Sequence, residues 1–440
     1  MNQLSIKVKK VLLALEEKGF EAYLVGGCVR DALLGQEPKD YDVTTNALPE
    51  QMAECFGAFK VIETGLKHGT LTVISDGEHV EVTTYRVDGA YMDHRRPASV
   101  SFTRSLREDL ARRDFTVNAM AYSEKDGLQD FFGGQADLQN RVLRCVGEPS
   151  RRFSEDALRI LRALRFSSVL DFDIELETKK ALVDLKERLR YISAERISSE
   201  LEKLLTGENV YAVLKEYARV IAVFIPEMER CIGFAQHSKY HRYDVWEHIC
   251  VAVASSRNDR TVRLAMLLHD IAKPACFYTD EQGEGHFYNH EKISAQWAEK
   301  ILRRLRYDRD TIQRVCLLIE HHYFTPVDEE KAIKRQLREI GPEAFFQLLD
   351  VQRADAMAKQ EFCLDRLPVL DAVEATAREI LRRQDCLERK DLAVNGNDLL
   401  ALGFRGTAVG DALDAVLEQV IQGTMPNNKA DLLTFLRDML

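Results

Sequence analysis

The sequence has 440 residues, of which 45% are hydrophobic and 30% are charged. This length and composition exclude a disulfide-stapled miniprotein and a disordered chain, and they favour a globular protein of about three packing units. The 61 Lys and Arg residues against 71 Asp and Glu residues leave a formal net charge of −10, which as an average argues against a nucleic-acid partner.

The cysteines and the first 20 residues both bear on where in the cell the protein is expected. The nine cysteines are odd in number and scattered, with no Cys-x-x-Cys pair, which is typical of free thiols in the cytosol. The first 20 residues interrupt their apolar positions with Lys and Glu, unlike a signal peptide, and no segment reaches the roughly 18 apolar residues of a membrane span. We therefore expect a cytoplasmic protein without a membrane partner.

The pattern of apolar residues divides the chain. Short β-branched runs punctuated by Gly and Asp predict strands only in the first third, at 20–27, 39–45, 68–75 and 79–87. From about residue 150, apolar residues recur at i, i+3, i+4 and i+7, which predicts helices almost throughout. The expected fold class is therefore α+β, with a small sheet in an N-terminal head and a long all-α remainder.

We place the domain boundaries at soft transitions in this pattern. The expected parts are a head at 1–147, a helical neck at 148–225, a histidine-rich helical unit at 226–385 and a short helical tail at 386–440.

The head contains a glycine turn followed by a carboxylate pair. Gly26 and Gly27 end the first predicted strand and open a helix, where backbone N–H groups can approach a phosphate. Asp40 and Asp42 lie two residues apart on the next predicted strand, so their carboxylates project to one face and can share divalent cations. Glu81, within a later strand, is a candidate third ligand. Hard oxygen donors beside a phosphate site suit Mg²⁺ and predict two-metal phosphoryl transfer.

These residues resemble the signature of class II tRNA nucleotidyltransferases and their bacterial poly(A) polymerase relatives, in which GGCVRDALLG is followed by KDYD. Further blocks follow in that family's order across the first 166 residues. They are TGLKHGT at 64–70, TTYRVDGAYMDHRRPASVSF at 83–102, LARRDFTVNAMAY at 110–122 and SEDALRILRALRF at 154–166. The resemblance implies a polymerase-β-like head with a small mixed sheet, which adds nucleotides from CTP and ATP to the 3′ end of tRNA.

The resemblance also implies roles for individual residues. Asp40 and Asp42 would hold two Mg²⁺ ions, with Glu81 as a third catalytic carboxylate. The expected nucleotide-binding residues are Gly27, Arg30, Arg113, Asp114, Asn118, Asp156, Arg159, Arg162 and Arg165.

The segment 154–166 predicts a helix opened by Ser154 as N-cap, with Asp156 and Arg159 as neighbours on one face. On sequence grounds this spacing is equally that of an exposed ion pair of little energetic value. The resemblance implies instead that the carboxylate and the guanidinium read the Watson–Crick edge of the incoming base. Cytosine and adenine present an amino donor, whereas uracil and guanine place a carbonyl there and leave the carboxylate unpaired.

Alternatives remain within the same family. In the family that this chain resembles, addition of all three nucleotides of CCA is linked to a flexible loop between the metal strand and the RRD block, and relatives that add only CC lack it. The polar stretch 85–104 suits that loop, so we favour CCA addition over CC-only or A-only addition. Poly(A) polymerases carry an arginine block after the DYD strand, where this chain has 63–70, and that departure disfavours polyadenylation.

Eight of the eleven histidines fall between His237 and His322. Their order, with MLLHDIAKP around the central His-Asp pair, resembles the HD superfamily, which is named for its helical His-Asp metal site. The candidate ligands are His248, His269, Asp270, Asp355, His290 and either His321 or His322. Imidazole together with carboxylate suits Mn²⁺, Ni²⁺, Fe or Mg²⁺.

Two interpretations of this unit stay open. It is either a metal-dependent phosphohydrolase that trims 2′,3′-cyclic phosphates, 2′-phosphates or nucleotides, or a scaffold that only helps to bind tRNA. In a rival scheme the protein is an HD phosphohydrolase whose head merely binds RNA.

The arginines cluster where the site is expected. Seven fall between Arg86 and Arg113, and five more between Arg151 and Arg165. Although the net charge of the chain is negative, these arginines therefore predict a basic surface at the expected site, which suits a triphosphate and a tRNA acceptor stem.

Overall fold

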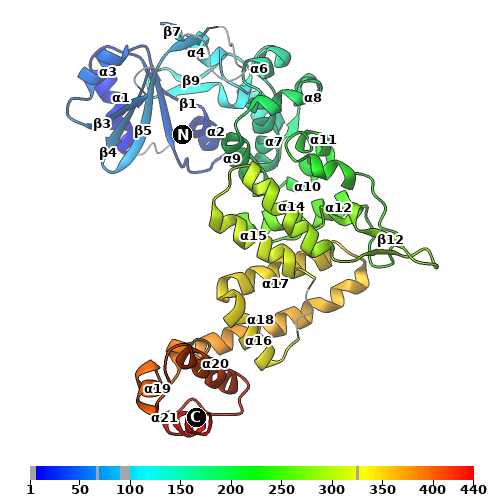
Figure 1. Ribbon diagram of the computed structural model, residues 1–440. Helices are drawn as coiled ribbons and strands as arrows, with labels where there is room; N and C mark the ends of the chain where they lie inside the picture. The colour runs from blue at the N-terminus through cyan, green and yellow to red at the C-terminus, as the bar shows by residue number, and fades with distance from the viewer. Residues whose placement is uncertain (1–5, 66–68, 90–99, 324–326) are drawn as a thin grey trace. The chain divides into compact units, whose positions relative to one another are not determined.

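The computed structural model describes residues 6–65, 69–89, 100–323 and 327–440. The chain forms two compact units, Met1–Pro226 and Glu227–Leu440 (Figure 1). This division falls at the predicted border between the neck and the histidine-rich unit, while the finer division into four parts stays a prediction. Among the described helices, none combines the length and the apolar character that crossing a membrane requires.

A seven-stranded mixed sheet in the order β3-β4-β5-β2-β1-β8-β9 forms the centre of the first unit. Its strands are β1 (Ala22–Val25), β2 (Tyr41–Thr45), β3 (Lys60–Gly65), β4 (Thr70–Ser75), β5 (Glu78–Thr84), β8 (Met120–Ser123) and β9 (Gly127–Asp130). Strands β2 and β5 are parallel, and the other neighbours are antiparallel. The predicted strands correspond to β1, β2, β4 and β5.

The expectation that strands occur only in the first third was wrong. Strand β10 (Val142–Leu143) pairs with β11 (Asp173–Ile174), and a hairpin joins β12 (Phe277–Thr279) to β13 (Gly285–Phe287). These strands are two or three residues long, too short to show the alternation by which strands are recognised. A further short pair, β6 (Arg86–Asp88) and β7 (Val100–Phe102), flanks part of the expected loop at 85–104, of which residues 90–99 lie outside the described residues.

Periodic burial explains how helix α1 (Ile6–Glu16) packs on the sheet. Val8, Val11 and Leu15 follow helical spacing and are fully buried, and the helix lies against β4. On β4 itself, Leu71 and Val73 alternate with more exposed residues and are also fully buried.

Short helices surround the sheet and continue into a helical segment. They are α2 (Gly27–Leu33), α3 (Pro49–Cys55), α4 (Leu106–Ala111), α5 (Gly134–Gln139), α6 (Pro149–Glu155), α7 (Leu158–Leu170), α8 (Leu176–Asp184), α9 (Ala194–Leu205), α10 (Val210–Glu216) and α11 (Ala218–Ile221). Helix α7 is buried along most of its length and packs on α9. The side chains of Arg159, Arg162 and Arg165 on this helix are therefore largely covered by neighbouring residues.

The second unit is almost entirely helical (Figure 1). Its helices are α12 (Val245–Ser255), α13 (Arg260–Leu268), α14 (His290–Arg304), α15 (Arg309–His321), α16 (Glu330–Ile340), α17 (Pro342–Met357), α18 (Leu367–Arg382), α19 (Gly396–Leu402), α20 (Thr407–Ile421) and α21 (Lys429–Asp438). Helices α12, α13, α15 and α17 pack on one another, and α14 packs on α15. The last three helices enclose an apolar cluster that includes Leu399, Val416 and Leu432.

Candidate functional sites

Three acidic residues lie close to one another on the head sheet. Asp42 of β2 and Glu81 of β5 are register partners on parallel strands, and Asp40 directly precedes β2. Because β2 begins at Tyr41, Asp40 lies just outside the strand, and the shared face is that of the register partners Asp42 and Glu81. Burial raises the pKa of Asp42, Arg113 opposes that rise, and the Glu81 and Asp40 carboxylates add to it. A set of carboxylate oxygens that repel one another fits a divalent cation such as Mg²⁺.

The glycine turn approaches these carboxylates closely. Gly26 has φ 78°, and a Cβ there would lie 3.0 Å from Arg113 Nη1 and 3.8 Å from Asp42 Oδ2. Gly27 is the first residue of α2, and a Cβ on it would lie 3.6 Å from Arg30 Nη2. Gly26 thus leaves room for the Arg113 guanidinium beside Asp42, and Gly27 leaves room for the Arg30 guanidinium. Burial lowers the pKa of Arg113, which Asp109 counteracts.

Four of the predicted nucleotide-binding residues form one buried polar network. Arg30 Nη1 donates to Asn118 Oδ1 at 2.7 Å, and Asn118 Nδ2 donates to Asp114 Oδ1 at 3.3 Å. Asp114 Oδ2 accepts from Arg162 Nε at 2.8 Å and from Arg162 Nη2 at 2.5 Å. Burial opposes ionisation of Asp114, but the Arg162 guanidinium outweighs it and lowers the pKa to about 2. The network ties α2 of the head to α7.

Three arginines of the predicted site lie against the ring of Phe166. The guanidinium carbons of Arg30, Arg162 and Arg165 lie 5.2, 5.3 and 3.9 Å from its ring centroid. Arg165 also pairs with Glu200 of α9 at 2.8 Å, and burial lowers its pKa to about 10. Sequence reasoning missed Phe166 and Glu200 as site residues. Phe166 closes the 154–166 block and could have been suspected, whereas Glu200 carries no motif.

The predicted helix from Ser154 is interrupted. Helix α6 ends at Glu155, α7 begins at Leu158, and Asp156 between them has an extended backbone with φ −137° and ψ 104°. Ser154 therefore does not act as an N-cap, and its hydroxyl donates to the Ser150 carbonyl within α6. Asp156 Oδ1 accepts from the backbone N–H of Leu158 at 3.1 Å, a local capping bond that competes with continuous helix.

The break gives Asp156 and Arg159 different partners. Arg196 of α9 donates to Asp156 Oδ2 at 2.7 Å. Arg159 donates to Glu155 Oε2 and to the Arg112 carbonyl, both at 3.0 Å. The expected i,i+3 pair on one helical face was wrong, because each side chain is held by another residue.

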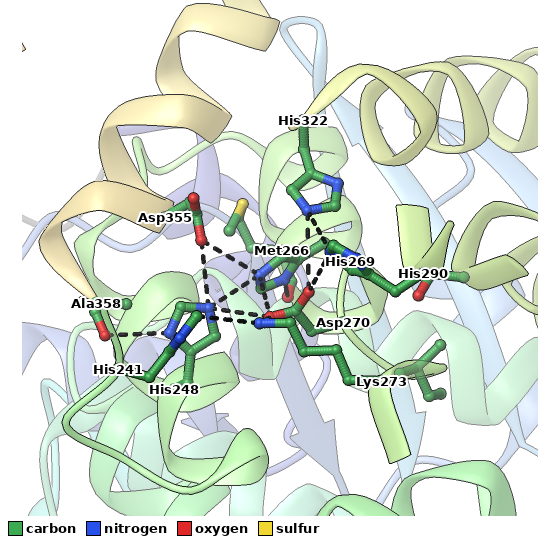
Figure 2. A network of polar contacts seen from close by, with 12 residues as sticks. His241, His248, Met266, His269, Asp270, Lys273, His290, His322, Asp355 and Ala358 are labelled. Atoms are coloured by element: carbon green, nitrogen blue, oxygen red, sulfur yellow. Dashed lines mark hydrogen bonds and ion pairs between the residues drawn. The ribbon is translucent and has the colours of Figure 1, made fainter. Parts of the chain in front are cut away.

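The second unit brings five of the predicted metal ligands together, with His322 as the sixth (Figure 2). His248 comes from α12, His269 and Asp270 follow α13, His290 opens α14, and Asp355 lies on α17. His248 Nε2 is 3.1 Å from Asp270 Oδ2 and 3.3 Å from Asp355 Oδ1. On the other side, His290 Nε2 is 3.3 Å from Asp270 Oδ1. Two groups of three possible ligands therefore share Asp270: one with His248 and His269, the other with His290 and His322.

Backbone carbonyls orient all four imidazoles. Each Nδ1 lies 2.6 to 3.1 Å from a carbonyl oxygen, which can only accept, so Nδ1 carries the proton. The pairs are His248 with Ala358, His269 with Met266, His290 with Phe287 and His322 with Ile319. In the neutral ring, the Nε2 lone pair is then free and faces Asp270, which is how metal-binding histidines are commonly held.

Protonation states also fit a metal centre. Burial lowers the pKa of His322 to about 3, so its ring is neutral at pH 7. Burial disfavours ionisation of Asp270, yet His269 and Lys273 hold its pKa well below the usual range. Burial opposes protonation of His248, but its hydrogen bonds to Asp270 and Asp355 outweigh that effect and raise its pKa. The neutral His322 imidazole and the ionised Asp270 carboxylate are donors that a divalent transition metal binds, whereas at His248 a metal competes with a proton.

His322 rather than His321 enters the cluster. Helix α15 ends at His321, and consecutive helical residues point about 100° apart, so only one of the two can face Asp270. His321 instead lines a separate surface hollow with Arg309 and Cys316. The sequence alone could not choose between them.

The cluster faces an open pocket of about 380 Å³. Two lysines line this pocket beside the carboxylates: Lys273 Nζ is 2.6 Å from Asp270 Oδ2, and Lys359 Nζ is 2.5 Å from Asp355 Oδ2. Lys273 follows the His-Asp motif, whereas Lys359 has no sequence signal.

Family models match three parts of the chain. A "Poly A polymerase head domain" matches residues 22–144, a "Probable RNA and SrmB- binding site of polymerase A" matches 171–231, and a "tRNA nucleotidyltransferase domain 2 putative" matches 280–436. The head match spans the glycine turn, the carboxylates and Asp114. The resemblance of the second unit to the HD superfamily stays a prediction.

Two curated relatives are both named as CCA-adding enzymes. A CCA-adding enzyme of Lactobacillus helveticus is 50% identical over 204 residues, which are 46% of this chain and 51% of that protein. This match spans about half the length of the relative. A CCA-adding enzyme of Streptococcus gordonii is 31% identical over 431 residues, covering 97% of this chain and 96% of that one.

Solved structures agree. The CCA-adding enzyme of Bacillus stearothermophilus in complex with CTP is 30% identical, covers 98% of this chain and 96% of its own, and superposes with a TM-score of 0.75. The Thermotoga maritima CCA-adding enzyme complexed with tRNA is 21% identical with a TM-score of 0.58, and shares the fold. The full-length matches agree with the polymerase head domain matched at 22–144. The chain belongs to the CCA-adding enzyme family.

Proposed function

We propose that this protein adds C, C and A from CTP and ATP to the 3′ end of tRNA without a nucleic-acid template. The observation that carries the proposal is the continuous buried network that links the glycine turn, Arg30, Asn118, Asp114 and Arg162 beside the Asp42 carboxylate. The full-length similarity to the Streptococcus gordonii enzyme supports it.

The chemistry needs positioning more than covalent participation by the protein. The tRNA 3′ oxygen forms a bond to the α-phosphorus, the bond from that phosphorus to the β-phosphate oxygen breaks, and pyrophosphate leaves with its electron pair. Asp40, Asp42 and Glu81 would hold Mg²⁺, which when bound would ease deprotonation of the hydroxyl and neutralise the leaving group. Gly27, Arg30 and Arg113 would bind the triphosphate, with guanidinium forks suited to phosphate oxygens.

Base selection falls to Asp156 and Arg159 in this proposal. Arg196 and Glu155 hold their head groups in place, so the carboxylate and the guanidinium meet the base already oriented. The interruption between α6 and α7 supports this role, because it places Asp156 at a helix boundary, where Arg196 and the Leu158 N–H hold its carboxylate. Arg162 and Arg165, with Phe166 beneath them, would line the same nucleotide site.

The proposal is tested with a matched pair of aspartate variants. Asp42→Asn removes one metal-binding charge and should lower single-turnover incorporation from CTP by at least 100-fold. Asp76→Asn changes an exposed carboxylate that pairs with Lys10 and should leave incorporation unchanged. Wild-type incorporation by Asp42→Asn would overturn the two-metal mechanism.

The second unit supports a second function, a metal-dependent phosphohydrolase. The observation that favours it is the set of four carbonyl-oriented imidazoles around Asp270. In this reaction a water oxygen bonds to phosphorus, the phosphorus–oxygen ester bond breaks, and the leaving oxygen takes a proton to give an alcohol and phosphate. A divalent metal held by these residues would supply a more acidic water.

Its test combines metal content with hydrolysis. The Asp42→Asn protein should retain a divalent transition metal after dialysis and release phosphate from adenosine 2′-monophosphate, whereas a further His290→Ala change should lower both. If the protein retains no metal and releases no phosphate with Mn²⁺, Ni²⁺, Fe²⁺ or Mg²⁺, the unit is a scaffold.

A further inference from the structure

Asp109 is a fully buried carboxylate beside the proposed triphosphate site, and no motif of the sequence pointed to it. It lies on α4, directly before the LARRDF block, and 0% of the residue is exposed. Aspartate is almost never buried to this degree unless its charge is paired. The partners of Asp109 therefore indicate what this carboxylate does.

Three hydrogen bonds fix the Asp109 carboxylate. Thr44 Oγ1 donates to Oδ2 at 3.1 Å, while the Arg86 backbone N–H and Arg112 Nε donate to Oδ1 at 3.2 and 3.0 Å. Thr44 lies two residues after Asp42 on β2, so both side chains project from the same face of the strand. The carboxylate is therefore held against the strand face that carries a proposed metal ligand.

Asp109 acts on Arg113 in a different way, through charge alone. Arg113 Nη2 is 3.9 Å from Asp109 Oδ2, which is an ion pair too long for a hydrogen bond. Arg113 Nε is buried, and within the described part of the chain it has no hydrogen-bond partner. A buried donor without a partner costs free energy, which a bound phosphate could recover. Arg113 is thus held in place with donor capacity left for an anion.

Other carboxylates near Arg113 cannot replace this counter-charge. Burial lowers the pKa of Arg113, and Asp109 opposes that effect most strongly. Asp42 and Asp114 contribute less. Divalent cations bound at Asp42 would offset its charge, and Asp114 is already paired with Arg162. In the loaded site, Asp109 therefore remains as the counter-charge of Arg113.

We propose that Asp109 is a positioning residue for nucleotidyl transfer, which holds the Arg113 guanidinium beside Asp42 so that it meets the triphosphate already oriented. The inference rests on the proposed function and adds to it a residue that acts only through Arg113. Because Arg113 would contact the triphosphate, loss of Asp109 should weaken binding of a nucleoside triphosphate more than binding of the monophosphate.

The experiment measures the KM for CTP and the inhibition constant of CMP during incorporation into a tRNA transcript that lacks CCA, so that both values report on the head. Asp109→Asn removes the charge and keeps the shape, and its amide can donate to the Thr44 hydroxyl, which also donates to the Thr83 carbonyl. The KM for CTP should rise about 10-fold, the size of one charge-assisted contact, and the inhibition constant of CMP should change less than about 2-fold.

Asp137→Asn is the matched control. Asp137 is a second buried carboxylate of the same unit, but it accepts from Thr116 Oγ1 at 2.7 Å and pairs with Arg144 at 3.1 Å. This variant should leave both constants unchanged. An equal rise of the KM in Asp109→Asn and Asp137→Asn would mean that any buried charge has this effect, and it would overturn the inference.

A double variant separates positioning from general structural support. Arg113→Ala should raise the KM for CTP at least as much as Asp109→Asn does, and adding Asp109→Asn should raise it no more than about 2-fold further, because the carboxylate then has no guanidinium to hold. A second rise of about 10-fold would show that Asp109 acts independently of Arg113, and would overturn the inference.

The same measurements distinguish this inference from the function on which it rests. A normal KM in Asp109→Asn, together with a raised KM in Arg113→Ala, would refute the positioning role and leave the proposed function standing. A normal KM in Arg113→Ala would refute both the triphosphate contact and the positioning role, and no incorporation by the wild-type chain would refute the function itself together with the inference.

Discussion

The ion pair between Asp114 and Arg162 allows a quantitative prediction of how much a contact with the head stabilises α7. Asp114→Asn keeps the shape of the side chain and removes its charge. The pKa of Asp114 falls from 3.8 to about 2, which corresponds to about 2 kcal/mol of preference for the ionised form in the folded chain. At pH 7 the variant should therefore lose about 2 kcal/mol of local stability around α7.

Hydrogen exchange measures this loss where it occurs. Amides of α7 should exchange about 30-fold faster in Asp114→Asn, whereas amides of α12 in the second unit should be unchanged and serve as an internal control. Asp171→Asn is a matched control, because that carboxylate is exposed and lies 3.5 Å from an exposed Arg141, where an ion pair contributes little.

The pH dependence has a definite sign. The folded-state pKa of Asp114 is depressed, so its contribution is complete above about pH 4, the ordinary value for an aspartate, and is lost as the pH falls towards 2. The difference between wild type and variant should narrow over that window. Unchanged α7 exchange at pH 7, or an equal effect of Asp171→Asn, would refute the reasoning.

Three further predictions concern single side chains. Arg196→Ala frees the Asp156 carboxylate and should relax discrimination against UTP more than it slows incorporation of CTP; unaltered selectivity would show that Arg196 does not orient the base-reading group. His322→Ala should lower the affinity for Mn²⁺ at least 10-fold in equilibrium dialysis, whereas His321→Ala should not, and equal effects would contradict the assignment. Val416→Ala in the fully buried core of the tail should cost about 1 to 3 kcal/mol of unfolding free energy in chemical denaturation, and a negligible change would contradict its packing role.

Periodic patterns of apolar residues in the sequence predicted those helices and strands that bury one face. The strands with β-branched alternation, such as β4 and β5, and the long amphipathic helices were confirmed, because burial on one face imposes a period on the sequence. The ordered motif blocks also pointed to residues that the fold brings together, as the Arg30 and Arg162 contacts illustrate.

Long-range partners could not be predicted in the same way. The partner that Asp156 has at the break is Arg196, forty residues away, and the local sequence gives no sign of this contact. The choice of His322 over His321 depends on where α15 ends relative to Asp270. Lys359 follows the end of α17 and pairs with Asp355 of that helix, so the fold and not a motif brings it to the cluster.

The most direct test of the central claim is the sequence that the purified protein adds to a tRNA transcript that ends before its CCA. With CTP and ATP together, the account predicts that sequencing of the 3′ ends finds C, C and A, and that CTP alone gives two additions. A homopolymeric A tail without C would contradict it and indicate a poly(A) polymerase, and products that stop at CC in the presence of ATP would indicate a CC-adding enzyme.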